Sequence, residues 1–153
     1  MPAYPQAMDL HAFARELLDE HRYVVLGTAD GHGDPWVSPV FYALDGYSSV
    51  LWLSRPDTRH SRNLAVRPRL SLVVYDSTAA IGAAKAVYMT ARAAIDPDGL
   101  DAYNRGCTAK GAEPFPPEKI NDKGPFRLYR AVVDEHWVLD PTVPRDERTP
   151  VSL

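Results

Sequence analysis

Short β-type segments separated by tight turns are the feature of this sequence that most restricts its fold. Runs of β-branched and aromatic residues, which favour strands, alternate with clusters of glycine, proline and aspartate, which favour turns. The chain has 14 prolines and 9 glycines among its 153 residues. Six strands are predicted, at residues 23–28, 36–44, 50–53, 70–75, 86–95 and 126–139. Because they follow one another mostly in hairpin order, they predict a mainly β (α+β) protein built on a small antiparallel barrel.

Three segments show helical periodicity instead. Apolar residues recur at helical spacing over residues 10–18, after Asp9 as a suitable N-cap. A short helix is predicted over 56–67, and a third over 96–105. No helix separates the first three strands, which argues against a doubly wound α/β fold. Pro39 lies inside a predicted strand, and a proline cannot donate to a sheet ladder. Its position is therefore an edge, a bulge or a ligand-facing site.

Length, composition and charge indicate one domain in the cytoplasm. We expect residues 1–140 to form a single domain, and the charged, proline-rich residues 141–153 to form a tail that drapes over the surface or is disordered. The net charge of −3 gives no general attraction to nucleic acid or to an anionic membrane. No apolar run approaches the roughly 20 residues of a membrane helix, and the N-terminal residues lack a signal-peptide core.

No metal-binding or catalytic pattern is recognisable in the sequence. The five histidines are scattered without the spacing of metal ligands, and we predict no metal site. Cys107, the single cysteine, excludes an internal disulfide and has no neighbouring base that would make it a nucleophile. Trp36 and Trp52 are interpreted as core or interface residues. No general acid or base stands out, so the catalytic residues are unknown.

The stretch Ser54 to Leu64 has the chemistry of a phosphate site. It runs from a strand into a helix, and a helix start presents unpaired N–H groups that favour acidic side chains. Here cations crowd the first turn instead, together with three hydroxyls: Arg59, His60 and Arg62, with Ser54, Thr58 and Ser61. N–H groups, hydroxyls and guanidinium groups together bind phosphate. The alternative is a solvated face, with the arginines paired to Asp57 or to the acidic first helix.

Several motifs follow one another in a fixed order between Tyr23 and Tyr75. They are Leu26-Gly27-Thr28, a turn through Gly33, Val37-Ser38-Pro39-Val40, Leu51-Trp52-Leu53-Ser54, Thr58-Arg59-His60, Asn63-Leu64 and Arg67-Pro68-Arg69-Leu70-Ser71-Leu72. In this succession, which covers about a third of the chain, the sequence resembles the FMN-binding split-barrel family related to pyridoxamine 5′-phosphate oxidase. The resemblance implies a six-stranded antiparallel split β-barrel with a few short helices, and a homodimer with two cofactor sites at the subunit interface.

The resemblance also implies which residues bind the cofactor. The strand of Val37, Ser38, Pro39, Val40 and Phe41 would lie along the isoalloxazine ring through main-chain groups. The phosphate and ribityl chain would contact Ser54, Thr58, Arg59 and His60, with Asn63 of the next matching motif beside them. Trp137, on the last strand, would reach the flavin of the partner subunit, or would anchor its own core. The sequence departs from the family at His60, where many relatives carry lysine.

Three functions follow from the resemblance. The leading hypothesis is an FMN-dependent oxidoreductase that acts on a small molecule, in which the flavin carries the chemistry. The second is a reductase of the same fold that uses the deazaflavin F420, which has a longer and more acidic tail. The third is a flavin-binding module without catalysis. The shared motifs concern the cofactor, so they do not identify the substrate, and the loop 105–125 is expected to shape the substrate side.

Overall fold

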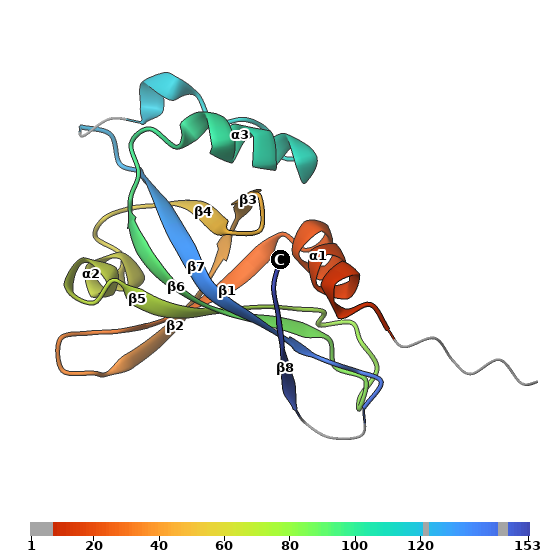
Figure 1. The fold of residues 1–153 in the computed structure, drawn as a ribbon. Coiled ribbons are helices and arrows are strands. Elements are labelled where there is room, and N and C mark those ends of the chain that lie inside the picture. The colour runs from red at the N-terminus through yellow and green to blue at the C-terminus, as the bar shows by residue number, and fades with distance from the viewer. Residues whose placement is uncertain (1–7, 121–122, 144–146) are drawn as a thin grey trace, which may run out of the picture.

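The computed structural model describes residues 8–120, 123–143 and 147–153, which form eight strands and three α-helices (Figure 1). In chain order the elements are α1 (Leu10–Glu20), β1 (Tyr23–Ala29), β2 (Pro35–Phe41), β3 (Ala43–Asp45), β4 (Ser49–Ser54), α2 (Arg59–Val66), β5 (Arg69–Tyr75), β6 (Ala86–Ile95), α3 (Leu100–Ala109), the 3₁₀ turn η1 (Pro117–Lys119), β7 (Arg127–Leu139) and β8 (Arg148–Val151). None of the described helices has the length and apolarity needed to cross a bilayer.

One curved sheet contains all eight strands, and every pairing within it is antiparallel. Seven of them follow the order β2-β1-β5-β6-β7-β4-β3, and β8 pairs with β7. The sheet curls into a half-barrel, with α1 against it on one side and α3 over β3 (Figure 1). This architecture confirms the predicted mainly β split barrel.

The strand count differs from the predicted six for two reasons. The segment 36–44 is divided at Tyr42, where the chain leaves β1 as its partner and begins to pair with β4 as β3. The second difference is in the tail, where Arg148–Val151 forms β8 beside the end of β7, so this part is neither disordered nor loosely draped. Residues 144–146 lie outside the described residues, and the domain boundary at residue 140 stays a prediction.

Alternation of side chains along the strands builds the core. The inward positions of the central strands are apolar and buried, as Leu26, Leu72 and Met89 show. The apolar stripe of α1, predicted from its periodicity, packs into the same cluster through Leu17 and Leu18. The N-cap of this helix is Asp9, as predicted, and its carboxylate accepts hydrogen bonds from two backbone N–H groups of the first turn.

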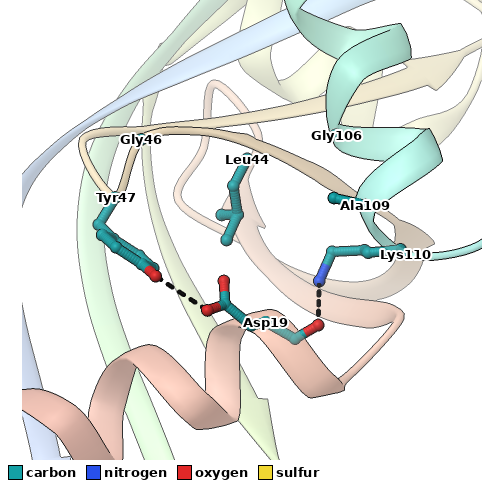
Figure 2. A pocket seen from close by; sticks show the side chains of 7 residues that line it. All are labelled: Asp19, Leu44, Gly46, Tyr47, Gly106, Ala109 and Lys110. Carbon is teal, nitrogen blue, oxygen red and sulfur yellow. Dashed lines mark hydrogen bonds between the residues drawn. The ribbon is translucent and has the colours of Figure 1, made fainter.

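A hollow of about 450 Å³ lies where α1, α3 and the β3–β4 turn meet, and its polar groups bind one another (Figure 2). Lys110 Nζ donates to the backbone oxygens of Leu18 (2.7 Å), Asp19 (3.2 Å) and His21 (2.7 Å) at the end of α1. The hydroxyl of Tyr47 donates to the Asp19 carboxylate at 2.8 Å. Because these groups are already partnered, we interpret the hollow as a structural joint between α1 and α3.

Lys110→Met should destabilise the fold. The substitution removes charge-assisted hydrogen bonds to the carbonyl end of α1, where a cation is favoured. Burial lowers the pKa of Lys110 to about 8, so desolvation offsets part of this gain. We expect a net loss of about 1–3 kcal/mol in the free energy of unfolding, measured by urea denaturation. The matched control is Lys119→Met on the exposed turn η1, and equal losses in the two variants would contradict the interpretation.

Candidate functional site

The N-terminus of α2 is organised by Thr58, which is the N-cap of the helix. Its Oγ1 accepts a hydrogen bond from the N–H of Ser61 at 3.2 Å and lies 2.7 Å from Ser61 Oγ. Asp57, the residue before the cap, forms an exposed ion pair with Arg55 at 3.2 Å. The N–H groups at the start of α2 that Thr58 does not cap stay available to a ligand. The predicted phosphate segment therefore starts a real helix, with hydroxyls clustered at its end.

Ser54 and His60 form a buried pair beneath this helix start. Ser54 Oγ and His60 Nε2 lie 2.9 Å apart, and both side chains are buried. Burial lowers the pKa of His60, so its ring is neutral at neutral pH. His60 therefore does not present the full positive charge that a lysine would bring to this position. The arrangement suits it instead to orienting the hydroxyl of Ser54.

A chain of contacts ties α2 to the β1–β2 hairpin. Asn63 Nδ2 donates to Thr28 Oγ1 at 3.1 Å, and Thr28 Oγ1 lies 3.4 Å from the backbone oxygen of Trp36. The guanidinium carbon of Arg59, one turn before Asn63 on α2, lies 4.2 Å from the centroid of the Trp36 ring. Four of the predicted site residues, Ser54, Thr58, Arg59 and His60, therefore lie around one helix start, and Asn63 fixes that helix to the sheet.

The predicted ring-binding strand, β2, is an edge strand, because it stands at one end of the strand order. This places Pro39 at an edge, one of the positions expected for it. Val37 is 68% exposed and Pro39 is also exposed, so they present an open surface. Ser38 is half-buried, whereas the side chains of Val40 and Phe41 pack against the two core clusters. Direct side-chain contact with a ligand is thus restricted to the first part of the strand.

A cleft of about 350 Å³ opens beside this strand, on the outer face of the sheet. The residues around it are Gly27, Thr28, Ala29, Pro35, Trp36, Val37, Arg69, Leu70, Ser71 and Thr90. Val37, Gly27, Ser71 and Thr90 form one row across β2, β1, β5 and β6. Ser71 and Thr90 were not predicted as site residues. The only sequence signal for Ser71 is strand alternation, which places it on the face of β5 opposite to the buried Leu70 and Leu72.

Trp137 is not brought to the other predicted site residues within the chain. It lies half-buried on β7, opposite Tyr88 of β6, and beside a separate hollow of about 460 Å³ near β8. In the strand order, β7 is the fourth strand after β2. A shared site would therefore need Trp137 of one subunit to reach the flavin of another.

Other reactive side chains give no alternative centre. The described residues contain no group of three or more histidine, cysteine, aspartate or glutamate side chains arranged for a metal ion. Cys107 is buried inside α3, and burial raises the pKa of its thiol, which disfavours the reactive thiolate. His136 is buried as well, with Nε2 2.9 Å from the backbone oxygen of Tyr47.

The fold is that of a split-barrel protein. The chain belongs to the pyridoxamine 5′-phosphate oxidase family, whose sequence profile matches residues 10–139. No curated protein matches the chain.

Solved structures share the fold at low sequence identity. A heme binding protein from Mycobacterium smegmatis has a TM-score of 0.73 at 23% identity, over 95% of this chain and 60% of that one. HutZ, the heme storage protein from Vibrio cholerae, has a TM-score of 0.63 at 24% identity, over 83% and 92% of the two chains. An F420 reductase has a TM-score of 0.58 at 18% identity, over 80% and 94%. At these identities the likeness establishes the fold.

The burial of His60 and His136 should make stability fall as the pH falls below about 6.5. Burial lowers the pKa of each ring below the ordinary value of 6.5. Between the pKa of a histidine in the folded chain and its pKa in the unfolded chain, the unfolded chain binds more protons. Lowering the pH through this range therefore lowers the free energy of unfolding, by at most about 1.4 kcal/mol per pH unit for each histidine. Denaturation curves from pH 8 to pH 5 measure this slope.

His60→Gln keeps a hydrogen-bonding side chain near Ser54 and should flatten the slope between pH 5 and 6.5. The control is His32→Gln in the exposed β1–β2 turn, which should leave the slope unchanged. An identical pH profile for wild type and His60→Gln would show that His60 does not titrate in the way its burial requires.

Proposed function

We propose that this protein binds FMN at the start of α2 and along β2, and that it acts on a small molecule as an FMN-dependent oxidoreductase. Family membership supports a phosphate-bearing cofactor, and the helix start supplies hydroxyls, backbone N–H groups and one cation for it. The cleft beside Val37 would receive the flavin ring.

The observation that carries the proposal is the isolation of Arg59. Three other arginines are neutralised by carboxylates, through the pairs Arg55–Asp57, Arg69–Asp134 and Arg130 with Asp45 and Asp96. Arg59 forms no ion pair with any acidic side chain of the described residues, although a cation at a helix N-terminus is unfavourable on its own. An anionic ligand removes this cost, and a phosphate matches the N–H groups of a guanidinium.

Different residues of the proposed site would bind different parts of FMN. Arg59, Thr58 and the helix start would hold the phosphate, while the Ser54 hydroxyl, oriented by His60, would support the ribityl chain or the phosphate. The edge of β2 would lie along the ring system with its unpaired main-chain groups. When bound, FMN supplies electron transfer, and the protein contributes position and electrostatics. No side chain is assigned as a catalytic acid or base.

F420 is the alternative cofactor, because an F420 reductase shares the fold. It also carries a phosphate, but its longer acidic tail needs further cations. A binding module without catalysis would use the same site without a substrate.

The absorption spectrum separates these proposals: oxidised FMN has two visible-range bands, F420 has one, and an empty protein has neither. A Soret band after incubation with heme would instead indicate the ligand named for two of the similar structures.

We also propose a homodimer that covers the outer face of the sheet. Large apolar side chains are exposed on this face, on four different strands: Tyr23 of β1, Val37 of β2, Tyr75 of β5 and Val132 of β7. Exposed apolar surface of this kind usually marks association, and a two-fold pair is the commonest assembly. The FMN cleft opens on the same face, so a partner would help to enclose the cofactor and could bring its own Trp137 to it.

FMN should quench tryptophan fluorescence with micromolar or tighter affinity. Arg59→Ala should weaken binding by about 1.5–3 kcal/mol, or roughly 10- to 150-fold, the usual worth of a charge-assisted hydrogen bond. The control is Arg105→Ala, an exposed arginine on α3, which should leave the affinity unchanged. No quenching by wild type at roughly 100 μM FMN, where a micromolar site is saturated, would rule out the proposal.

The dimer should sediment at twice the chain mass of 17.0 kDa at low micromolar concentration. Val132→Asp should dissociate it, because burying an unpaired charge in an interface is costly. Ile81→Asp, in the fully exposed β5–β6 turn, is the matched control and should sediment like wild type. A folded monomer that still binds FMN stoichiometrically would contradict the dimer and leave the cofactor proposal intact.

A further inference from the structure

We infer that Trp36 is the positioning residue for Arg59, and that it thereby gives the site its preference for phosphorylated over unphosphorylated flavins. The inference rests on the proposed FMN site and goes beyond it by naming what selects the phosphate. Trp36 was interpreted from the sequence as a core or interface residue. It is 41% exposed, at the wall of the cleft, so it is not a core residue.

The contact between the two side chains has the geometry of a cation–π interaction. The Arg59 guanidinium carbon lies 4.2 Å from the centroid of the Trp36 ring. Tryptophan is the aromatic side chain that attracts a cation most strongly, and a guanidinium stacked on it keeps its N–H groups at the rim, free to donate elsewhere. The contact therefore holds Arg59 without consuming the donors that a phosphate needs.

No acidic side chain of the described residues forms an ion pair with Arg59, although the nearby Asp30 attracts it electrostatically. The carboxylate of Asp30, in the adjacent β1–β2 turn, accepts hydrogen bonds from the backbone N–H groups of His32 (2.8 Å) and Asp34 (3.0 Å). Asp57, two residues before Arg59, is paired with Arg55. The ring of Trp36 is thus the partner that fixes where the guanidinium lies.

Trp36, whose ring contacts Arg59, is itself fixed relative to α2. The backbone oxygen of Trp36 lies 3.4 Å from Thr28 Oγ1, and Thr28 Oγ1 accepts a hydrogen bond from Asn63 of α2. The contacts close a loop from α2 through β1 to β2 and back to α2 at Arg59. A long arginine side chain loses rotamer freedom when it binds a ligand, and holding it beforehand reduces that loss.

The test measures the affinities of wild type and variants for FMN and for riboflavin, which lacks the phosphate. Trp36→Leu should weaken FMN binding about two- to fivefold, because the freed Arg59 side chain would then have to be ordered when the ligand binds. Riboflavin affinity should not change, because Arg59 acts on the phosphate. Trp36→Phe keeps an aromatic face and should restore most of the loss. In an Arg59→Ala background, Trp36→Leu should have no further effect.

Tyr47→Leu is the matched control, because it removes the stacking of Arg15 on Tyr47, a similar contact remote from α2. It should not alter either affinity. Thermal unfolding checks that each variant is folded, and Trp36→Thr, which suits an edge strand, replaces the leucine variant if that one unfolds.

Three results would overturn the inference while leaving the FMN site in place. They are unchanged FMN affinity in Trp36→Leu, an equal loss of riboflavin affinity, and a loss that persists without Arg59. An equal loss for both ligands would mean that Trp36 contacts the flavin ring itself. Failure of wild type to bind FMN would overturn the proposed function, and this inference with it.

Discussion

The antiparallel register of the central strands is the constraint on which the rest of the molecule depends. Because side chains alternate along a strand, every residue that fills the barrel forces its neighbour onto the outer face. Leu26 and Leu72 point inward and are fully or almost fully buried, so Gly27 and Ser71 must point outward. The same register aligns them with Val37 across the edge strand. The floor of the cleft is therefore a direct consequence of how the core is packed.

Helix α2, whose Leu64 packs into the core cluster, adds a cation beside the edge strand through the contact of Arg59 with Trp36. Its C-terminal end is held by Arg67, which donates to the backbone oxygens of Asp30 (2.7 Å) and Gly31 (3.2 Å) in the hairpin turn. Asn63 makes the second attachment, to Thr28 of β1. With two attachments to one hairpin, the helix cannot shift relative to β2 without breaking the exposed Arg67 hydrogen bonds or the buried one of Asn63. The phosphate end and the ring end of the proposed site are thereby kept at a constant separation.

Features that depend on local sequence patterns were predicted correctly, whereas features that depend on pairing between distant segments were missed. The apolar periodicity of α1 and the short helix predicted over 56–67 are local features, and both helices are present, although α2 begins only at Arg59. The division at Tyr42 was missed because it reflects a change of hydrogen-bonding partner, which composition does not record. Strand β8 was missed because a short segment containing Pro150 becomes a strand only by pairing with β7. Thr90 could not be placed at the cleft without the register between β5 and β6.

The burial of His60 decides how much charge the site can offer, and so which phosphate suits it. A neutral His60 leaves Arg59 and Arg62 as the cations near the start of α2, supplemented by about half a unit of positive charge from the helix dipole. These charges suit a phosphate monoester such as that of FMN, which carries about −1.5 to −2 at neutral pH. A cofactor with a further acidic tail needs cations beyond the phosphate. Arg69, the arginine at the cleft, is already paired with Asp134 at 3.2 Å. In the proposed site, Arg69 therefore offers no unpaired cation to a longer acidic tail.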